Sequence, residues 1–171
     1  MNNISFTDYI NDSIRILIIA NTVKDRKSLK LTENKIKLFD YYLKFPKTML
    51  GNINSDGDSK NNFDEYYAFF HWQPDLIRYR RSINYLIAKG FIEKRFEKND
   101  LYYAITDNGM NVMKDVNSTY KYKLVKLANI IFKDVVKLSD AKIEEEIIRK
   151  ANIYLRSNRG GVDSESKDEN H

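Results

Sequence analysis

Residues 74–116 read PDLIRYRRSINYLIAKGFIEKRFEKNDLYYAITDNGMNVMKDV, and this stretch decides the fold. Pro74-Asp75 is typical of a helix start, and Gly90 predicts where that helix ends. The runs FIEKRF and LYYAIT then predict two strands around a turn at Lys98–Asp100. Thr106-Asp107 predicts the start of another helix. A helix followed directly by a two-stranded hairpin is typical of the recognition helix and wing of a winged helix-turn-helix.

Helical patterns also precede this stretch. Apolar residues recur at helical spacing over Ile4–Val23, which predicts a helix with a broad buried face. A second helix runs through KIKLFDYYLKF, with Ser28 or Thr32 as its N-cap. It must end near Pro46, because the residue before proline avoids the helical region.

Two amphipathic helices are expected after the wing, over Tyr120–Val136 and Asp140–Leu155. We therefore expect a mainly α fold with a small β-wing: a winged helix-turn-helix framed by one N-terminal and two C-terminal helices. The expected organisation is a domain over 1–157, with the recognition helix and wing at 74–116 and the C-terminal helices at 118–157, and a disordered polar tail over 158–171.

Composition narrows the class of protein. The chain has 171 residues, of which 42% are hydrophobic and 31% charged, as expected for one globular domain with a core. It has no cysteine, which excludes disulfides and thiolate metal sites and favours a reducing cytoplasm. No apolar run approaches the roughly 18 residues of a membrane span, and the polar start is unlike a signal peptide. We expect a cytoplasmic protein, mature from Met1, with no membrane contact.

Basic residues concentrate on the predicted recognition helix and wing. The formal net charge is only +5, but residues 75–98 hold seven Lys or Arg against three acids. At about 100° per residue, the expected core face of the helix consists of Leu76, Tyr79, Ile83, Leu86 and Ile87. The opposite face and the wing supply the candidate DNA- or partner-binding residues Arg78, Arg81, Tyr85, Lys89, Lys94, Arg95 and Lys98. The alternative is a face that is basic only for solubility, as on many winged helices that do not bind DNA.

Two motifs imitate metal sites without completing them. The segment 51–62 has the glycine spacing of a calcium loop, but Phe63 stands where a bidentate acid is needed, so we expect a flexible loop. Asp75 and Glu93–Arg95 resemble fragments of a metal-dependent nuclease motif, but Asp75 begins a helix and arginine replaces the lysine.

No other motif predicts catalysis. His71 is the only histidine outside the tail and lies in the aromatic block 63–72, which we expect to be a short helix packed on the core. A lone histidine offers neither a zinc pair nor a nucleophile triad, and no GxxxxGK phosphate loop is present. We expect a protein that is not an enzyme, with no catalytic residues, no metal and no cofactor.

Five short stretches recur in an order and spacing that carry a family resemblance: Ile14–Leu17, Lys37–Leu43, Arg78–Ser82, Leu86–Ile92 and Tyr102–Gly109. Together they resemble the small middle component of bacterial three-component ABC-ATPase defence systems, the group that includes Lamassu. The likeness spans roughly residues 10–157, nearly all of the chain expected to be ordered.

The resemblance implies protein partners. Middle components accompany an SMC-like coiled-coil ATPase dimer and a separate effector, often a nuclease, in a complex that guards against phage or plasmid DNA. The middle component would bind near the ATPase heads and hold the effector in check, with double-stranded DNA as a further candidate partner. The resemblance implies no catalytic residue for this chain.

Two other readings of the same residues stay open. The first is a homodimeric winged-helix transcription regulator that binds DNA and dimerises through its C-terminal helices. The second is a scaffold whose basic face never meets DNA, which would show no salt-dependent affinity for nucleic acid.

Overall fold

The computed structural model describes residues 6–51 and 76–159. It is mainly helical with a small two-stranded antiparallel sheet. In chain order the elements are α1 Phe6–Val23, α2 Glu33–Lys44, α3 Pro46–Leu50, α5 Leu76–Ala88, β1 Ile92–Glu97, β2 Asp100–Ile105, α6 Asp107–Asp115, α7 Thr119–Ile131, the 3₁₀ turn η2 Val135–Lys137, and α8 Asp140–Arg159.

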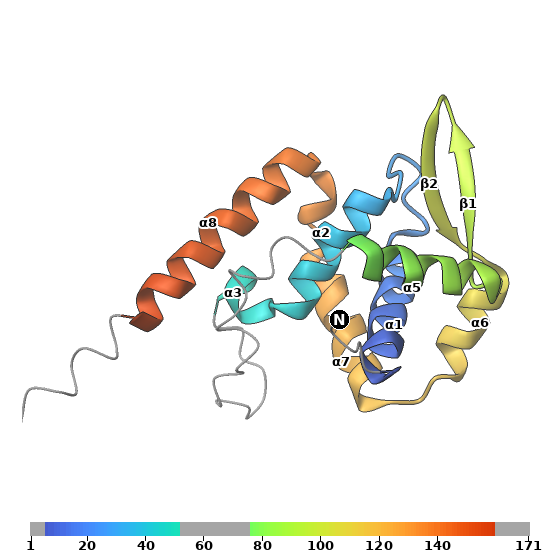
Figure 1. Ribbon diagram of the computed structural model, residues 1–171, viewed down its shortest axis with the longest axis horizontal. Helices are drawn as coiled ribbons and strands as arrows, with labels where there is room; N and C mark the ends of the chain where they lie inside the picture. The colour runs from blue at the N-terminus through green and yellow to red at the C-terminus, as the bar shows by residue number, and fades with distance from the viewer. Residues whose placement is uncertain (1–5, 52–75, 160–171) are drawn as a thin grey trace, which may run out of the picture.

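The helix α1 runs through the centre of the molecule. It contacts α2, α5, α6, α7 and β2, and every residue from Ile16 to Ala20 is buried. A helix that is apolar on all sides is stable only when other elements surround it. In Figure 1, α8 and the β1–β2 hairpin extend from opposite sides of this central region.

The predicted boundaries of the second helix, α2, are confirmed by the structure. Thr32 is the N-cap of α2 and accepts a hydrogen bond of 3.2 Å from the Lys35 amide, so it is the N-cap in preference to Ser28. The helix ends at Lys44, and Pro46 opens the short α3. Proline suits the first position of a helix because its missing N–H would be unpaired there.

Gly90 ends α5 as predicted. Its φ of 67° is left-handed, a conformation that glycine adopts without strain. Its amide donates to the Ile87 carbonyl, and the Phe91 amide donates to the Leu86 carbonyl. This paired arrangement is a Schellman motif, which satisfies the last carbonyls of the helix and redirects the chain into β1.

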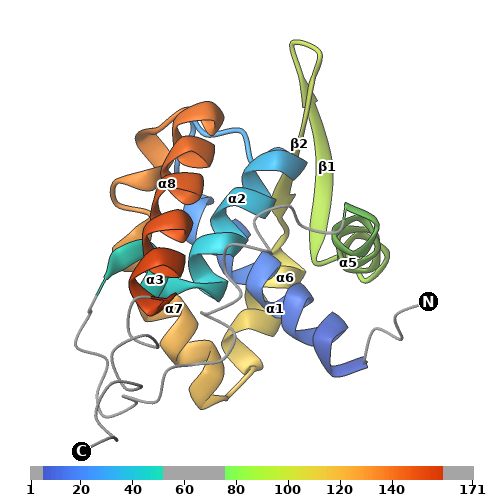
Figure 2. The ribbon, with the colours of Figure 1, turned by 60° about the vertical axis from the view of Figure 1, so that its left-hand side comes forward.

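The turn of the hairpin is one residue shorter than the sequence predicts. Glu97 pairs with Asp100, so Asp100 belongs to β2 and only Lys98 and Asn99 lie in the loop. Both have positive φ, 49° and 72°, as a two-residue type I′ turn requires. Such a turn matches the right-handed twist of its two strands, and in Figure 2 the hairpin projects well beyond the helices.

A backbone hydrogen bond links the hairpin to the connection before α2, beside the side-chain hydrogen bonds that Lys30 donates to Glu97 and Asp100. The amide of Tyr103 in β2 donates to the carbonyl of Leu31 over 2.9 Å. The following helix α6 begins where expected, since Thr106 caps it by accepting from the Gly109 amide at 3.0 Å.

The two C-terminal helices differ from the prediction in length. The helix α7 ends at Ile131, not Val136, and the chain continues through the 3₁₀ turn η2. Phe132 and Val135 remain buried across this break. The centroids of the Phe132 and Phe39 rings lie 4.7 Å apart. Because the turn keeps buried side chains at helical spacing, the apolar pattern alone does not reveal the break.

The last helix, α8, extends past the predicted Leu155 and contacts α2 and α3. Its contacts to these helices include a Lys35–Asp140 ion pair and a hydrogen bond of 3.0 Å from the Tyr42 hydroxyl to Glu146. Figure 2 shows α8 lying over α2 and α3, away from the hairpin.

Several predictions fall outside the described residues. They concern the segment 52–62, the aromatic block 63–72 with His71, the helix start at Pro74-Asp75, and the tail from residue 160 onward. None of the helices in the described ranges is both long and apolar enough to cross a membrane.

Candidate interaction surface on α5 and the hairpin

The predicted core face of α5 is largely correct. Tyr79, Ile83 and Leu86 are almost completely buried, and Ile87 packs against the core in a partly buried position. Leu76 is the exception, with 45% of its surface exposed. The buried stripe therefore begins one turn into the helix, at Tyr79.

Arg78 is not on the free face of the helix, which corrects the prediction. Its Nε donates to Oδ2 of Asp12, and only 27% of its side chain is exposed. Asp12 lies on α1, is 1% exposed, and also accepts from Arg15. Because α1 lies against α5, Arg78 reaches a buried carboxylate that needs cationic partners. Its charge is committed to the fold.

The Tyr85 side chain packs against α1 and is only partly exposed to solvent. Its ring meets the Tyr9 ring edge-on, with centroids 5.2 Å apart. The Tyr9 hydroxyl donates to the Arg81 carbonyl at 3.1 Å, and the Lys89 ammonium lies 5.7 Å from the centroid of the Tyr85 ring. Tyr85 is still 39% exposed, so a partner can contact a ring that is already positioned.

The remaining cations of α5 and the hairpin fall into two groups. Arg80 pairs with Glu33 at 3.2 Å, and Arg95 pairs with Glu93 at 2.6 Å. By contrast, no carboxylate of the described residues forms an ion pair with Arg81, Lys89, Lys94 or Lys98. Of the seven predicted site residues, these four are the cations that remain available, beside Tyr85.

The hairpin itself carries no net charge. Between Ile92 and Asp100 its three basic residues are balanced by Glu93, Glu97 and Asp100. The window 75–98 omits Asp100, which pairs with Lys30 at 2.9 Å. The hairpin is therefore less cationic than the count of charges over residues 75–98 indicates.

Exposed apolar side chains are a feature of this surface that the sequence analysis did not identify. Phe96 is 74% exposed and lies opposite Leu101 in the hairpin register, itself 38% exposed. The same face of the hairpin also carries Ile92, Tyr103 and Ile105, which are buried, and Lys94, which is exposed. The alternation of side chains between the two faces of a strand is the sequence signal that could have predicted Phe96 and Leu101 on one face.

On α5, Ile77 is a further exposed apolar side chain. It is 62% exposed and precedes the exposed Arg81 by one turn. Exposed apolar side chains that lie next to each other, as Phe96 and Leu101 do, are typical of surfaces that bind other proteins.

A buried polar network fixes α5 in place. Arg15 donates to Asp40 at 2.5 Å, and the Tyr79 hydroxyl donates to the same carboxylate. Lys44 lies 3.3 Å from the Asp40 carboxylate. Burial opposes ionisation of Asp40, but Arg15 and Lys44 outweigh it and hold its pKa at about 2. The network thus joins α1, α2 and α5 through one ionised carboxylate.

No arrangement among the described residues resembles a metal centre: residues 6–51 and 76–159 contain no group of three His, Asp or Glu side chains that could hold an ion. On α5 and the hairpin the exposed groups are aromatic, apolar and cationic.

The family model for the ABC-three component (ABC-3C) system Middle Component 2 matches residues 5–157. This chain belongs to the Middle Component 2 family. The match covers all the elements from α1 to α7 and most of α8, so both the α5–hairpin surface and the helices behind it lie within the family region. As a middle component of an ABC-3C system, the chain is one part of a multi-subunit assembly. No curated protein and no solved structure matches it.

Proposed function

We propose that this Middle Component 2 protein is a non-enzymatic accessory subunit that links an SMC-like ABC ATPase to a nuclease effector in a cytoplasmic Lamassu-type defence system against phage and plasmid DNA. In this proposal α5 and the hairpin dock onto a protein partner. Family membership supports a role within an assembly. The resemblance described above supplies the identity of the partners.

We further propose that the fold is a winged helix-turn-helix with an enlarged connection. The elements follow the order of helices and strands in that fold: α1, the segment with Leu31 that bonds to β2, α2, α5 and the hairpin. The backbone bond between Leu31 and Tyr103 takes the place of a third strand. The connection between α2 and α5 is much longer than a simple turn, since it includes α3.

The observation that carries the docking role is the mixture of groups on this surface. The hairpin is neutral overall and presents Phe96, whereas a DNA-binding wing would be expected to carry a surplus of cations. Aromatic side chains and arginine are enriched in the central part of protein–protein interfaces.

The test is reconstitution of the complex from its purified components. Phe96→Ser should weaken binding of the ATPase or the effector by at least about tenfold, corresponding to about 1.4 kcal/mol, because it removes an aromatic side chain that is 74% exposed. Phe96 contributes little to the core, so the variant should unfold at the same temperature as the wild type. Ile153→Ser on α8 is the matched control, since Ile153 is also exposed, at 55%. Unchanged assembly of the Phe96 variant would refute the docking role.

DNA contact is the second candidate, and the four cations that form no ion pair within the described residues favour it. Arg81 and Lys89 lie on α5 and its end, while Lys94 and Lys98 lie on the hairpin. If they neutralise phosphates, affinity for duplex DNA should fall steeply with salt, and Arg81→Glu with Lys89→Glu should reduce that slope by about 2. A salt slope near zero for the wild type would exclude this role.

A homodimeric regulator is the remaining alternative, and exposed isoleucines on α8 favour it. Ile148 and Ile153 are 37% and 55% exposed, and a dimer formed through the C-terminal helices would bury them. Light scattering of the isolated chain distinguishes the two: a stable dimer favours the regulator, and a monomer favours the accessory subunit.

A further inference from the structure

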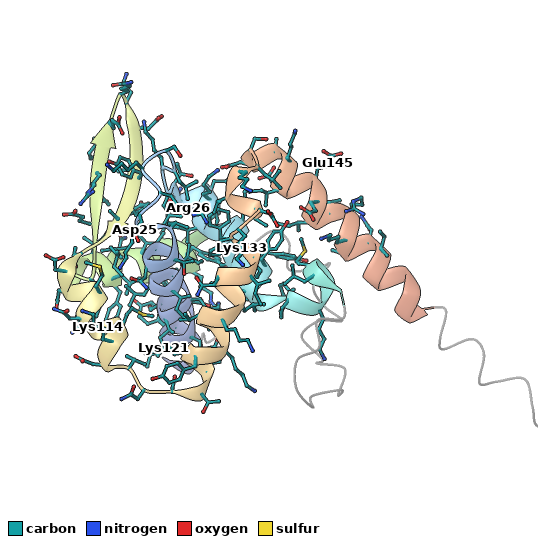
Figure 3. The ribbon with its side chains drawn as sticks, turned by 180° about the vertical axis from the view of Figure 1, so that it is seen from behind. Asp25, Arg26, Lys114, Lys121, Lys133 and Glu145 are labelled. Atoms are coloured by element: carbon teal, nitrogen blue, oxygen red, sulfur yellow. The ribbon has the colours of Figure 1, made fainter. Side chains whose placement is uncertain are left out.

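A groove on the opposite side of the molecule from α5 contains a buried lysine with unused hydrogen-bonding capacity. The groove has a volume of about 650 Å³ and lies between the end of α1, α6 and the start of α7. Met110, Met113 and Val125 line it together with Lys24, Lys114 and Lys121. Figure 3 labels Lys114 on α6 and Lys121 on α7, which both line the groove, and Lys133, which follows the end of α7.

Lys121 is the residue that points to an anionic partner. It is only 6% exposed, yet no carboxylate among the described residues pairs with its ammonium. Its Nζ donates to the Met113 carbonyl at 2.8 Å and lies 4.7 Å from the centroid of the Tyr122 ring. The Met113 carbonyl is one of the last in α6, so this bond caps the helix. An ammonium has three donors, and within the described chain the other two have no acceptor.

The rest of the groove reinforces this charge. Lys24 and Lys114 are exposed at its rim, and Asp107 is its one acidic lining residue. Three lysines against one aspartate leave a surplus of two positive charges. A buried charge without a counter-ion is costly, and a carboxylate entering the groove would offset that cost.

The apolar lining decides between an acidic protein segment and nucleic acid. Methionines pack against partners of varied shape because their side chains are unbranched and polarisable. A phosphate backbone would gain nothing from Met110, Met113 and Val125, whereas a peptide can fill the groove with apolar side chains and direct its carboxylates at the lysines.

We propose that this groove binds an acidic segment of a partner component, with apolar side chains seated on Met110 and Val125 and a carboxylate paired with Lys121. The site is distinct from α5 and the hairpin, so it would give the middle component a second docking face. It goes beyond the function proposed above and depends only on the chain having protein partners.

The test uses the full chain with the purified components of its own ABC-3C system. A photo-crosslinker, p-benzoylphenylalanine, replaces Asn111, which is exposed and lines the groove. The control has the same crosslinker at Asn129, an exposed residue of α7 outside the groove. Crosslinks from position 111 to a segment rich in Asp and Glu with interspersed apolar residues, absent from position 129, support the proposal. Crosslinks from position 111 to DNA, to a basic or neutral segment, or to a second copy of the chain overturn it, as does the absence of any crosslink.

Affinity measurements with the crosslinked component provide the second readout. Lys24→Glu with Lys114→Glu should weaken binding by at least about tenfold. Lys123→Glu with Lys133→Glu makes the same change in net charge outside the groove and should leave the affinity within about twofold of the wild type. Equal effects of the two pairs would show a general charge effect and overturn the proposal. Because none of these variants alters α5 or the hairpin, failure here leaves the function proposed above untouched.

Discussion

The guanidinium of Arg78 on α5 and the carboxylate of Asp12 on α1 form an ion pair between residues 66 positions apart in the sequence. Asp12 is buried, and Arg15 binds its other oxygen, so one carboxylate fastens two helices. The pair therefore sets where α5 lies, and with it the positions of Arg81, Tyr85 and Lys89 on the outer surface.

Replacing Arg78 should mainly reduce stability. We expect Arg78→Ala to lower the free energy of unfolding by about 2 kcal/mol, because Arg78 is one of three cations, with Arg15 and Lys44, that pair with the buried Asp12 carboxylate. Arg81→Ala is the matched control and should stay within about 0.5 kcal/mol of the wild type, since no carboxylate of the described chain pairs with its side chain. Urea unfolding measures both variants. If Arg78→Ala were as stable as Arg81→Ala, the ion pair would have no structural role.

Acid should destabilise the protein through Asp40. The pKa of Asp40 is held at about 2, below its ordinary value of 3.8, because Arg15 and Lys44 outweigh the effect of burial. A carboxylate with a lowered pKa contributes stability above the unfolded-state pKa and loses it as the pH falls through the folded-state value. Asp40 should therefore contribute about 2 kcal/mol at pH 7, and this contribution should decline between about pH 5 and pH 2.

Two measurements check the acid effect. Urea unfolding from pH 7 to pH 3 should show the loss of stability. Asp140 also contributes to this loss, because burial raises its pKa but the hydrogen bonds from Lys35 and Asn34 lower it by more. Carbon-13 NMR of the Asp40 carboxyl isolates its own titration. A midpoint near 4 would contradict the assignment, whatever the overall stability curve shows.

Local signals account for the parts of the fold that the sequence predicted. Thr32, Gly90 and Thr106 mark helix ends through their own hydrogen bonds or backbone angle, and these depend on immediate neighbours. The hairpin was predictable for the same reason. Its loop was set one residue too long because Asp100, a common turn residue, pairs with Glu97 as part of β2.

Long-range contacts account for what the sequence could not supply. On a helical wheel Arg78 faces away from the core. Only the packing of α1 against α5 brings the Asp12 carboxylate next to the Arg78 guanidinium. The partial burial of Tyr85 depends in the same way on Tyr9. The groove beside Lys121 is assembled from α1, α6 and α7, so no single stretch of sequence contains it.

Gly109 should be sensitive to the smallest substitution. A Cβ at this position would lie 2.1 Å from the Phe91 carbonyl oxygen and 2.9 Å from Cγ1 of Ile105. Relief requires the backbone between α5 and β1 to shift, so we expect Gly109→Ala to cost about 2 kcal/mol despite the better helix propensity of alanine. Asn111→Ala on the same helix is exposed and should be neutral or slightly stabilising. Thermal unfolding compares the two, and equal melting temperatures would show that the close approach is not real.

The two-residue turn allows the charge at the hairpin tip to be removed without disturbing the fold. Lys98 and Asn99 both have positive φ, and Asn-Gly is the preferred sequence for such a turn. The double variant Lys98→Asn with Asn99→Gly should therefore raise the free energy of unfolding by about 0.5 kcal/mol while removing one cation. Lys98→Val is its counterpart, because it removes the same charge but a β-branched residue strains the left-handed conformation. If Lys98 contacts a partner or DNA, both variants should lose the same affinity although their stabilities change in opposite directions. An affinity that instead follows stability would assign Lys98 to the turn alone.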